Sequence, residues 1–215
     1  EISLGLVGSE MCIRDSGNDA ARKAAAKLNV PRIGVRFRLP AEMNVVEYFG
    51  RGPEENYIDR NAGTLIGLYK TTADKMYYNY VRPQENGHHT DTRWLSLSKK
   101  GGKGLTIVAD SIIGFNALRN SIEDFDSEEA LPHPRQWNNF SPEKIANHDE
   151  EAARNVLRRM HHVNDITPRD FVEVCVDMKQ QGVAGYNSWG ARPEPGYTIP
   201  ANQEYNWGFT LIPDK

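Results

Sequence analysis

The sequence predicts an all-β fold, an antiparallel sandwich with one short helix, and three observations support this. Apolar and polar residues alternate through 33–39, which gives a strand one buried side and one solvent-facing side. Similar short runs recur along the chain. They are separated by turn-like segments such as 99–102, where glycine can supply the positive φ of a hairpin. Many short strands with such turns favour a sandwich over alternating strand–helix units.

The expected elements follow one another closely. The first strand is expected at 31–40, because prolines bracket the alternating residues. Further strand-type runs cover 44–49, 64–71, 92–98, 104–109, 171–178 and 206–211. One helix is expected to begin at Ser141, which is followed by a proline at the first helical position and then by an acid. The prolines within 132–140 predict a loop before it.

The first 30 residues are expected to form a non-native or disordered leader and loop, so that the domain covers 31–215. Residues 1–16 neither alternate like a strand nor keep helical spacing, and they lack the regions of a signal peptide. They are similar to the translated linker read-through seen in assembled environmental sequences. Residues 20–27 could form two helical turns, but Pro31 soon forces the chain to extend.

Composition excludes several functional classes. The chain has 26 Lys and Arg against 29 Asp and Glu, a net charge of −3, so neither nucleic acid nor an anionic membrane is an expected partner. No apolar run approaches the roughly 20 residues that cross a bilayer. Two cysteines cannot build a disulfide framework, which leaves the compartment open between cytoplasm and periplasm.

The titratable residues give weak signals for catalysis. The histidines are interpreted as loop or surface residues, and no metal site is expected, because adjacent histidines on a strand face opposite ways. Cys175 lies in an apolar run, which predicts a buried thiol. The acids within 123–129 are interpreted as a solvated loop, since nothing there promises the burial that a general acid needs. The sequence has no nucleophile elbow, phosphate loop or dinucleotide fingerprint.

A loop near the C-terminus is more informative. Residues 182–195 are too rich in Gly and Pro for a regular element, yet they include Tyr186 and Trp189. A tryptophan in such a loop either packs against the end of a sandwich or offers its face to a ligand. A sugar suits that face, because its axial C–H bonds form an apolar patch that packs on an indole. The residues alone leave both alternatives open.

Three motifs occur in order along the chain. They are GRGPEENYIDR at 50–60, YVRPQENG at 80–87 followed by Arg93, and Asn-Ser-Trp at 187–189. The stretch PRIGVRF from Pro31 and YNWGF at 205–209 accompany them. Together they resemble the C-terminal domain of glycoside hydrolase family 2 β-galactosidases, also called the small chain or domain 5. The resemblance covers about 31–212.

This resemblance implies a β-supersandwich of the galactose-mutarotase-like type within a multidomain enzyme. Such enzymes hydrolyse terminal β-galactosides such as lactose with retention, using two glutamates of a separate TIM-barrel domain. Neither catalytic segment matches this chain, and the family's magnesium and sodium ligands belong to other domains. The resemblance therefore implies an isolated chain without activity or cofactor, which works with the remaining domains or large chain of a homo-oligomeric enzyme.

The resemblance assigns roles to a few residues. Trp189 matches the tryptophan that stacks on the sugar at the mouth of the active site. Five residues are assigned to loop architecture, where buried polar groups satisfy turns: Glu55, Asn56, Tyr57, Glu85 and Asn86. Asp59 is expected to form an ion pair with Arg60 or Arg93.

The chain also departs from the family, whose domain begins several strands earlier. A sandwich that lacks strands exposes edges and an apolar face, so the isolated chain is expected to be poorly stable or to associate. Two other functions remain as alternatives. One is a free-standing carbohydrate-binding or structural module. The other is an aldose mutarotase, which needs a histidine and a glutamate facing each other across a cleft.

Overall fold

The computed structural model describes residues 3–7, 28–125, 163–187 and 190–214, and these form an antiparallel all-β fold. The strands are β1 (Ser3–Val7), β2 (Arg32–Pro40), β3 (Val45–Gly52), β4 (Leu65–Thr72), β5 (His89–Ser98), β6 (Gly104–Leu118), β7 (Phe171–Gln180) and β8 (Phe209–Pro213). Four short 3-10 turns accompany them: η1 (Ala73–Lys75), η2 (Ile122–Asp124), η5 (Val163–Asp165) and η6 (Pro195–Tyr197). The predicted fold class is confirmed. The helix expected from Ser141 lies outside the described residues.

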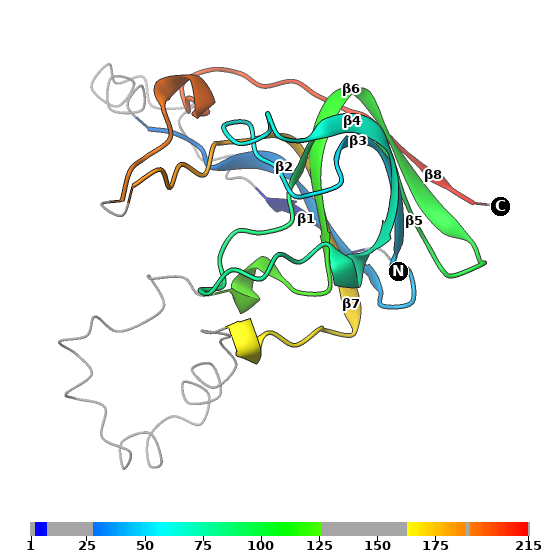
Figure 1. Cartoon of the computed structure of the whole chain (residues 1–215). Coiled ribbons are helices and arrows are strands. Elements are labelled where there is room, and N and C mark those ends of the chain that lie inside the picture. The colour runs from blue at the N-terminus through cyan, green and yellow to red at the C-terminus, as the bar shows by residue number, and fades with distance from the viewer. Residues whose placement is uncertain (1–2, 8–27, 126–162, 188–189, 215) are drawn as a thin grey trace, which may run out of the picture.

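The strands form one strongly bent sheet with the order β1-β2-β7-β6-β5-β3-β4, and β8 also pairs with β6. The long β6 joins the parts of this sheet and arches through Figure 1. Strand β5 pairs with both halves of β6, whereas β8 pairs with its first half and β7 with its second half. Between the pairs Trp94↔Val108 and Thr92↔Ile113 the register shifts, so β6 carries extra residues there. Such a bulge bends a strand, which lets the two ends of the sheet face each other.

The hydrophobic core lies inside this bend. The alternating residues of β2 place Phe37 and Leu39 in it, 2% and 3% exposed. Apolar residues of β7 face them, and Leu95 and Leu97 of β5 and Tyr48 of β3 complete the cluster. All seven predicted strands are therefore present. Several bounds were wrong: β3 continues to Gly52, β5 begins already at His89, β6 continues to Leu118 and β8 begins only at Phe209.

The leader contains a strand that the sequence did not predict. Ser3–Val7 pairs antiparallel with β2, from Ser3↔Arg38 to Val7↔Gly34. The expectation that these residues would not form a strand was wrong, because Leu4 and Leu6 alternate with Ser3 and Gly5 in the sequence, and the edge of β2 offers this segment backbone partners. Residues 20–27 lie outside the described residues, and the domain boundary at residue 31 remains a prediction. No described helix is long and apolar enough to cross a membrane.

Candidate functional site

The first motif covers the end of β3 and the loop that follows it, and several contacts hold this loop in place. Gly50 packs against Thr92, where an added Cβ would lie 2.4 Å from Oγ1, so only glycine fits. Arg51 donates to the Asp91 carboxylate at 2.7 Å and to the Thr64 carbonyl at 2.7 Å. Asn56 is fully buried. The loop therefore has a fixed shape at the end of the sandwich.

Asn56 holds this loop to the start of β5. Its Nδ2 donates to the carbonyls of Arg51 and Glu54, at 3.1 and 3.0 Å. Its Oδ1 accepts from the Thr90 amide at 2.9 Å and from the Thr90 hydroxyl at 2.6 Å. The side chain thus uses both donors and accepts twice, which a buried amide requires. Asn86 acts similarly in the second motif, where it exchanges hydrogen bonds with the backbone of Tyr78.

An open cleft of about 370 Å³ is lined by residues of the first motif and by tyrosines of the second motif and the segment before it. Glu55 lies in it and accepts from Arg60 at 2.8 Å, from the Gly87 amide at 2.7 Å and from the Tyr80 hydroxyl. Arg60 also donates to the Tyr80 oxygen at 2.7 Å. Burial and the neighbouring Glu55 raise the pKa of Tyr80 to about 12. The rings of Tyr78 and Tyr80 lie 4.8 Å apart, and Tyr78 is half exposed.

Asp59 does not make the expected ion pair. Arg60 pairs with Glu55 instead. Arg93 donates to the Asp91 carbonyl at 2.6 Å and lies over the Phe49 ring. The Asp59 carboxylate accepts from two consecutive backbone amides of the loop that carries Trp189. It therefore connects the first motif to the third.

That loop begins where β7 ends. The Gly182 amide donates to the Tyr197 carbonyl at 2.8 Å, which closes its base. Ala184 and Gly185 both have positive φ, at 52° and 85°. The Tyr186 side chain is 65% exposed. Trp189 lies outside the described residues, so its stacking role remains a prediction.

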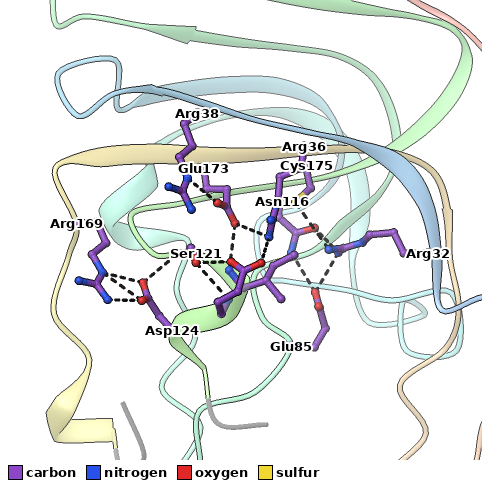
Figure 2. Close-up of polar contacts among 12 residues, drawn as sticks. Arg32, Arg36, Arg38, Glu85, Asn116, Ser121, Asp124, Arg169, Glu173 and Cys175 are labelled. Carbon is purple, nitrogen blue, oxygen red and sulfur yellow. Dashed lines mark hydrogen bonds and ion pairs between the residues drawn. The ribbon is translucent and has the colours of Figure 1, made fainter. Parts of the chain in front are cut away.

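A buried polar network underlies these loops, and sequence reasoning missed it. Figure 2 shows Arg32 among its partners. Its Nη2 donates to Glu85 at 3.1 Å and to Asn116 at 2.9 Å, and its Nε lies 3.3 Å from Asp177. The Asn116 Oδ1 also accepts a hydrogen bond from His88 Nδ1 at 2.8 Å. The available signal was the acids inside the apolar run of β7, because a charge in a buried strand requires a partner.

The histidines were expected in loops or at the surface, but His88, in the loop before β5, and His89, in β5, are both buried. His88 and His89 are each 2% exposed, and burial lowers their pKa values to about 3 and about 4. They do face opposite ways. His88 stacks on Tyr57, whereas His89 contacts Tyr48 and Phe115. Neither reaches a cleft, so neither supplies the histidine that a mutarotase needs.

The acidic segment is only partly solvated, contrary to expectation. Glu123 is exposed and pairs with Arg36, but Asp124 is 6% exposed. Burial alone would raise the pKa of Asp124. Bonds from Arg169, at 3.0 and 3.1 Å, and from the Ser121 amide hold that pKa below its usual value. A general acid needs a raised pKa, so Asp124 does not suit that role. The rest of the segment lies outside the described residues.

Asp177 of β7 is a buried carboxyl with a raised pKa. Burial raises it to about 7, even though Arg32 acts in the opposite direction. Asp177 is 1% exposed, so no glycosidic oxygen can reach it. The Cys175 thiol is also buried, as predicted, and burial raises its pKa. Within the described part of the chain, no three potential metal ligands are grouped to hold an ion.

Comparison with known proteins identifies the family. The sequence model of the β-galactosidase small chain matches residues 10–211. The chain belongs to the β-galactosidase small-chain family. A β-galactosidase of Priestia megaterium is 32% identical over 184 residues, which is 86% of this chain and 15% of that protein. One from an Arthrobacter species is 39% identical over 137 residues, 61% of this chain and 13% of that protein. A third, from Streptococcus thermophilus, is 26% identical over 186 residues, 86% and 15%.

The match to the small-chain family includes the loops described above. All three motifs lie within the matched residues. The chain spans about 15% of the length of the β-galactosidases from P. megaterium and S. thermophilus. A small-chain domain of this size therefore corresponds to a minor part of each of these relatives.

Proposed function

We propose that this chain is the C-terminal part of a retaining β-galactosidase of glycoside hydrolase family 2, and that it shapes the substrate entrance. The observation that carries the proposal is the family match over nearly the whole chain, combined with the small share of each relative that it covers. The enzyme hydrolyses terminal β-galactosides such as lactose and works as a homo-oligomer. Its two glutamates and its magnesium and sodium ligands belong to domains outside this chain.

The chemistry of the described residues supports this division of labour. A retaining glycosidase needs two carboxyls about 5–5.5 Å apart, one of them with a raised pKa. The carboxyl with the raised pKa, Asp177, is sealed in the core. In the open cleft, Glu55 is occupied by three donors. Neither Asp177 nor Glu55 is therefore suited to act as the acid of a glycosidase. In this proposal, cleavage of the glycosidic bond requires acids from another domain.

Trp189 provides the contact with substrate in this proposal. The loop that carries it has a closed base and an exposed aromatic residue, Tyr186. A sugar stacked on an indole gains contact with its apolar C–H face. Trp189 therefore contributes to substrate binding and leaves the chemical step to the catalytic glutamates.

Replacing Trp189 tests this role. The measurement is hydrolysis of a chromogenic β-galactoside by the complete enzyme that contains this chain. Trp189→Ala is expected to raise KM by about twofold to tenfold with little change in kcat, the range of one aromatic contact. Trp189→Phe should recover part of the loss. Trp207→Phe is the control, because Trp207 packs on Phe209 beside the core and should leave KM unchanged.

The isolated chain provides the second half of this test. It should show no turnover of the chromogenic galactoside. An unchanged KM for Trp189→Ala would refute the stacking role. Turnover by the isolated chain that is abolished by mutating one of its own acids would refute the proposal that the catalytic acids belong to another domain.

A free-standing carbohydrate-binding module is the second candidate, and the cleft between the motifs favours it. Tyr78 and Tyr80 line this cleft together with charged groups, an arrangement that suits hydroxyl-rich ligands. Titration calorimetry of the isolated chain with lactose distinguishes the two functions. Affinity that is lost in Tyr78→Ala would favour the module, whereas the absence of heat would favour the enzyme part.

A further inference from the structure

Asp59 joins the first motif to the loop that carries Trp189. Its Oδ1 accepts from the Val183 amide at 3.1 Å, and its Oδ2 accepts from the Ala184 amide at 2.7 Å. We propose that Asp59 is a positioning residue, which sets the base of this loop and thereby the substrate contact made further along it. This inference rests on the proposed function, because it gives the loop a substrate to contact.

The loop backbone is shaped to receive a carboxylate. Two consecutive amides point at one side chain, and the following residues Ala184 and Gly185 both have positive φ. Successive amides in such a conformation form a concave site for an anion. Positive φ in a non-glycine residue costs free energy and persists only where surrounding contacts require it. The hydrogen bond from the Ala184 amide to the Asp59 carboxylate is the contact that holds Ala184 in this conformation.

Gly182 allows the two segments to approach. A Cβ on Gly182 would lie 2.4 Å from Oδ2 of Asp59, and Oδ2 sits near the base of a short side chain that cannot move far. The Gly182 amide meanwhile donates to Tyr197 on the other side of the loop. The base is therefore fixed from two directions, and either contact fails if the loop moves outward.

The turn that carries Asp59 is itself rigid. Tyr57 and Arg60 exchange backbone hydrogen bonds across it, at 2.7 and 3.3 Å. The Tyr57 ring is 1% exposed and lies between His88, 5.5 Å away, and the guanidinium of Arg60, 5.2 Å away. Because Arg60 pairs with Glu55, the Asp59 carboxylate is left to bind the loop. Its position therefore follows that of the buried sandwich end.

This arrangement predicts how a binding loop gains accuracy. A glycine-rich segment on its own samples many conformations, and ordering it costs binding free energy. Two charge-assisted hydrogen bonds at its base remove part of that freedom before substrate arrives. The effect of Asp59 should therefore appear in substrate binding and pass through Trp189.

A double-mutant cycle in the complete enzyme tests this inference. Asp59→Asn keeps the size of the side chain but replaces one of its two acceptor oxygens with an NH2 group. Gly182→Ala adds a Cβ that pushes the loop away from Asp59. Each is expected to raise KM about twofold to tenfold and to leave kcat within about twofold. In the Trp189→Ala background, Asp59→Asn should have little further effect on KM. Glu47→Gln is the matched control, since Glu47 pairs only with Lys70 on the exposed sheet face among the described residues, and it should change nothing.

Hydrogen exchange of the loop amides separates the possible failures. In Asp59→Asn, the peptide containing Val183 and Ala184 should exchange faster, while peptides from β7 stay protected. If Trp189→Ala raises KM but Asp59→Asn does not, the positioning role is refuted and the proposed function stands. If Trp189→Ala itself leaves KM unchanged, the stacking role of Trp189 in the proposed function fails, and the positioning role of Asp59 fails with it. Additive effects of Asp59→Asn and Trp189→Ala on KM would also overturn the inference, because they would mean that Asp59 acts independently of Trp189.

Discussion

Asp177 is a carboxyl placed deep in a sandwich, between groups that act on it in opposite directions. Arg32 lies 3.3 Å away and favours the ionised form, and neutral His88 lies 3.7 Å away. Glu85, on the far side of Arg32, opposes ionisation. No described group donates a hydrogen bond to either Asp177 oxygen, so the cost of burial prevails. The folded protein therefore holds a proton on Asp177 that the unfolded chain releases near pH 4.

This proton makes stability depend on pH. Because the folded pKa, about 7, exceeds the unfolded one, the stabilisation is complete below about pH 4 and is lost as the pH rises through 7. Asp177→Asn has no proton to lose. Relative to the wild type, its free energy of unfolding should therefore increase by about 2–3 kcal/mol between pH 5 and pH 8. Urea titrations at both pH values measure this, and an equal difference at the two pH values would contradict it.

The two motif loops depend on buried amides more than on ion pairs. Asn56 and Asn86 each bond the backbone of a neighbouring segment, so each replaces the hydrogen bonds of a regular element. In contrast, the pairs Lys70–Glu47 and Lys99–Glu42 lie at the surface, where a pair contributes about 0–1 kcal/mol. The shape of these loops therefore relies on polar groups that are satisfied inside the protein.

Removing the Asn56 amide should weaken the loop strongly. Asn56→Ala leaves the Thr90 amide and hydroxyl and the Glu54 carbonyl without this partner, whereas the Arg51 carbonyl keeps its contact with His89 Nδ1. An unsatisfied buried group costs about 1–3 kcal/mol, so a loss of roughly 3 kcal/mol in unfolding free energy is expected. Asn44→Ala, which removes only an exposed bond to Asp74, should cost less than about 1 kcal/mol. Thermal denaturation of both variants decides it, and similar losses would be inconsistent with this role.

The whole molecule presents an apolar row on the outer face of its sheet. Leu68 of β4 stands opposite Phe49 of β3, which stands opposite Trp94 of β5. Leu68 is 64% exposed and Phe49 is 37% exposed. β4 is also the last strand in the sheet order, so its far edge has no partner among the described strands. An apolar edge strand of this kind tends to associate.

The isolated chain is therefore expected to self-associate through this edge. Leu68→Lys should shift it toward monomer, because a charge on an edge strand opposes pairing. Ile112→Lys provides the control, since Ile112 is comparably exposed, at 47%, but lies on β6. Sedimentation velocity measures the distribution. A wild-type chain that is already monomeric, or equal effects of the two substitutions, would refute this explanation.

The sequence by itself determined seven of the eight described strands, because alternation and turn residues are local properties that need no partner. It also determined the family, through motifs that are contiguous in the chain. Tertiary structure decided the rest. Asp59 meets Val183, 124 positions away, and Arg32 meets Asp177 from another strand. The same long-range packing buried His88, His89 and Asp124, because burial depends on which segments the bend in β6 brings together, and no local pattern encodes that choice.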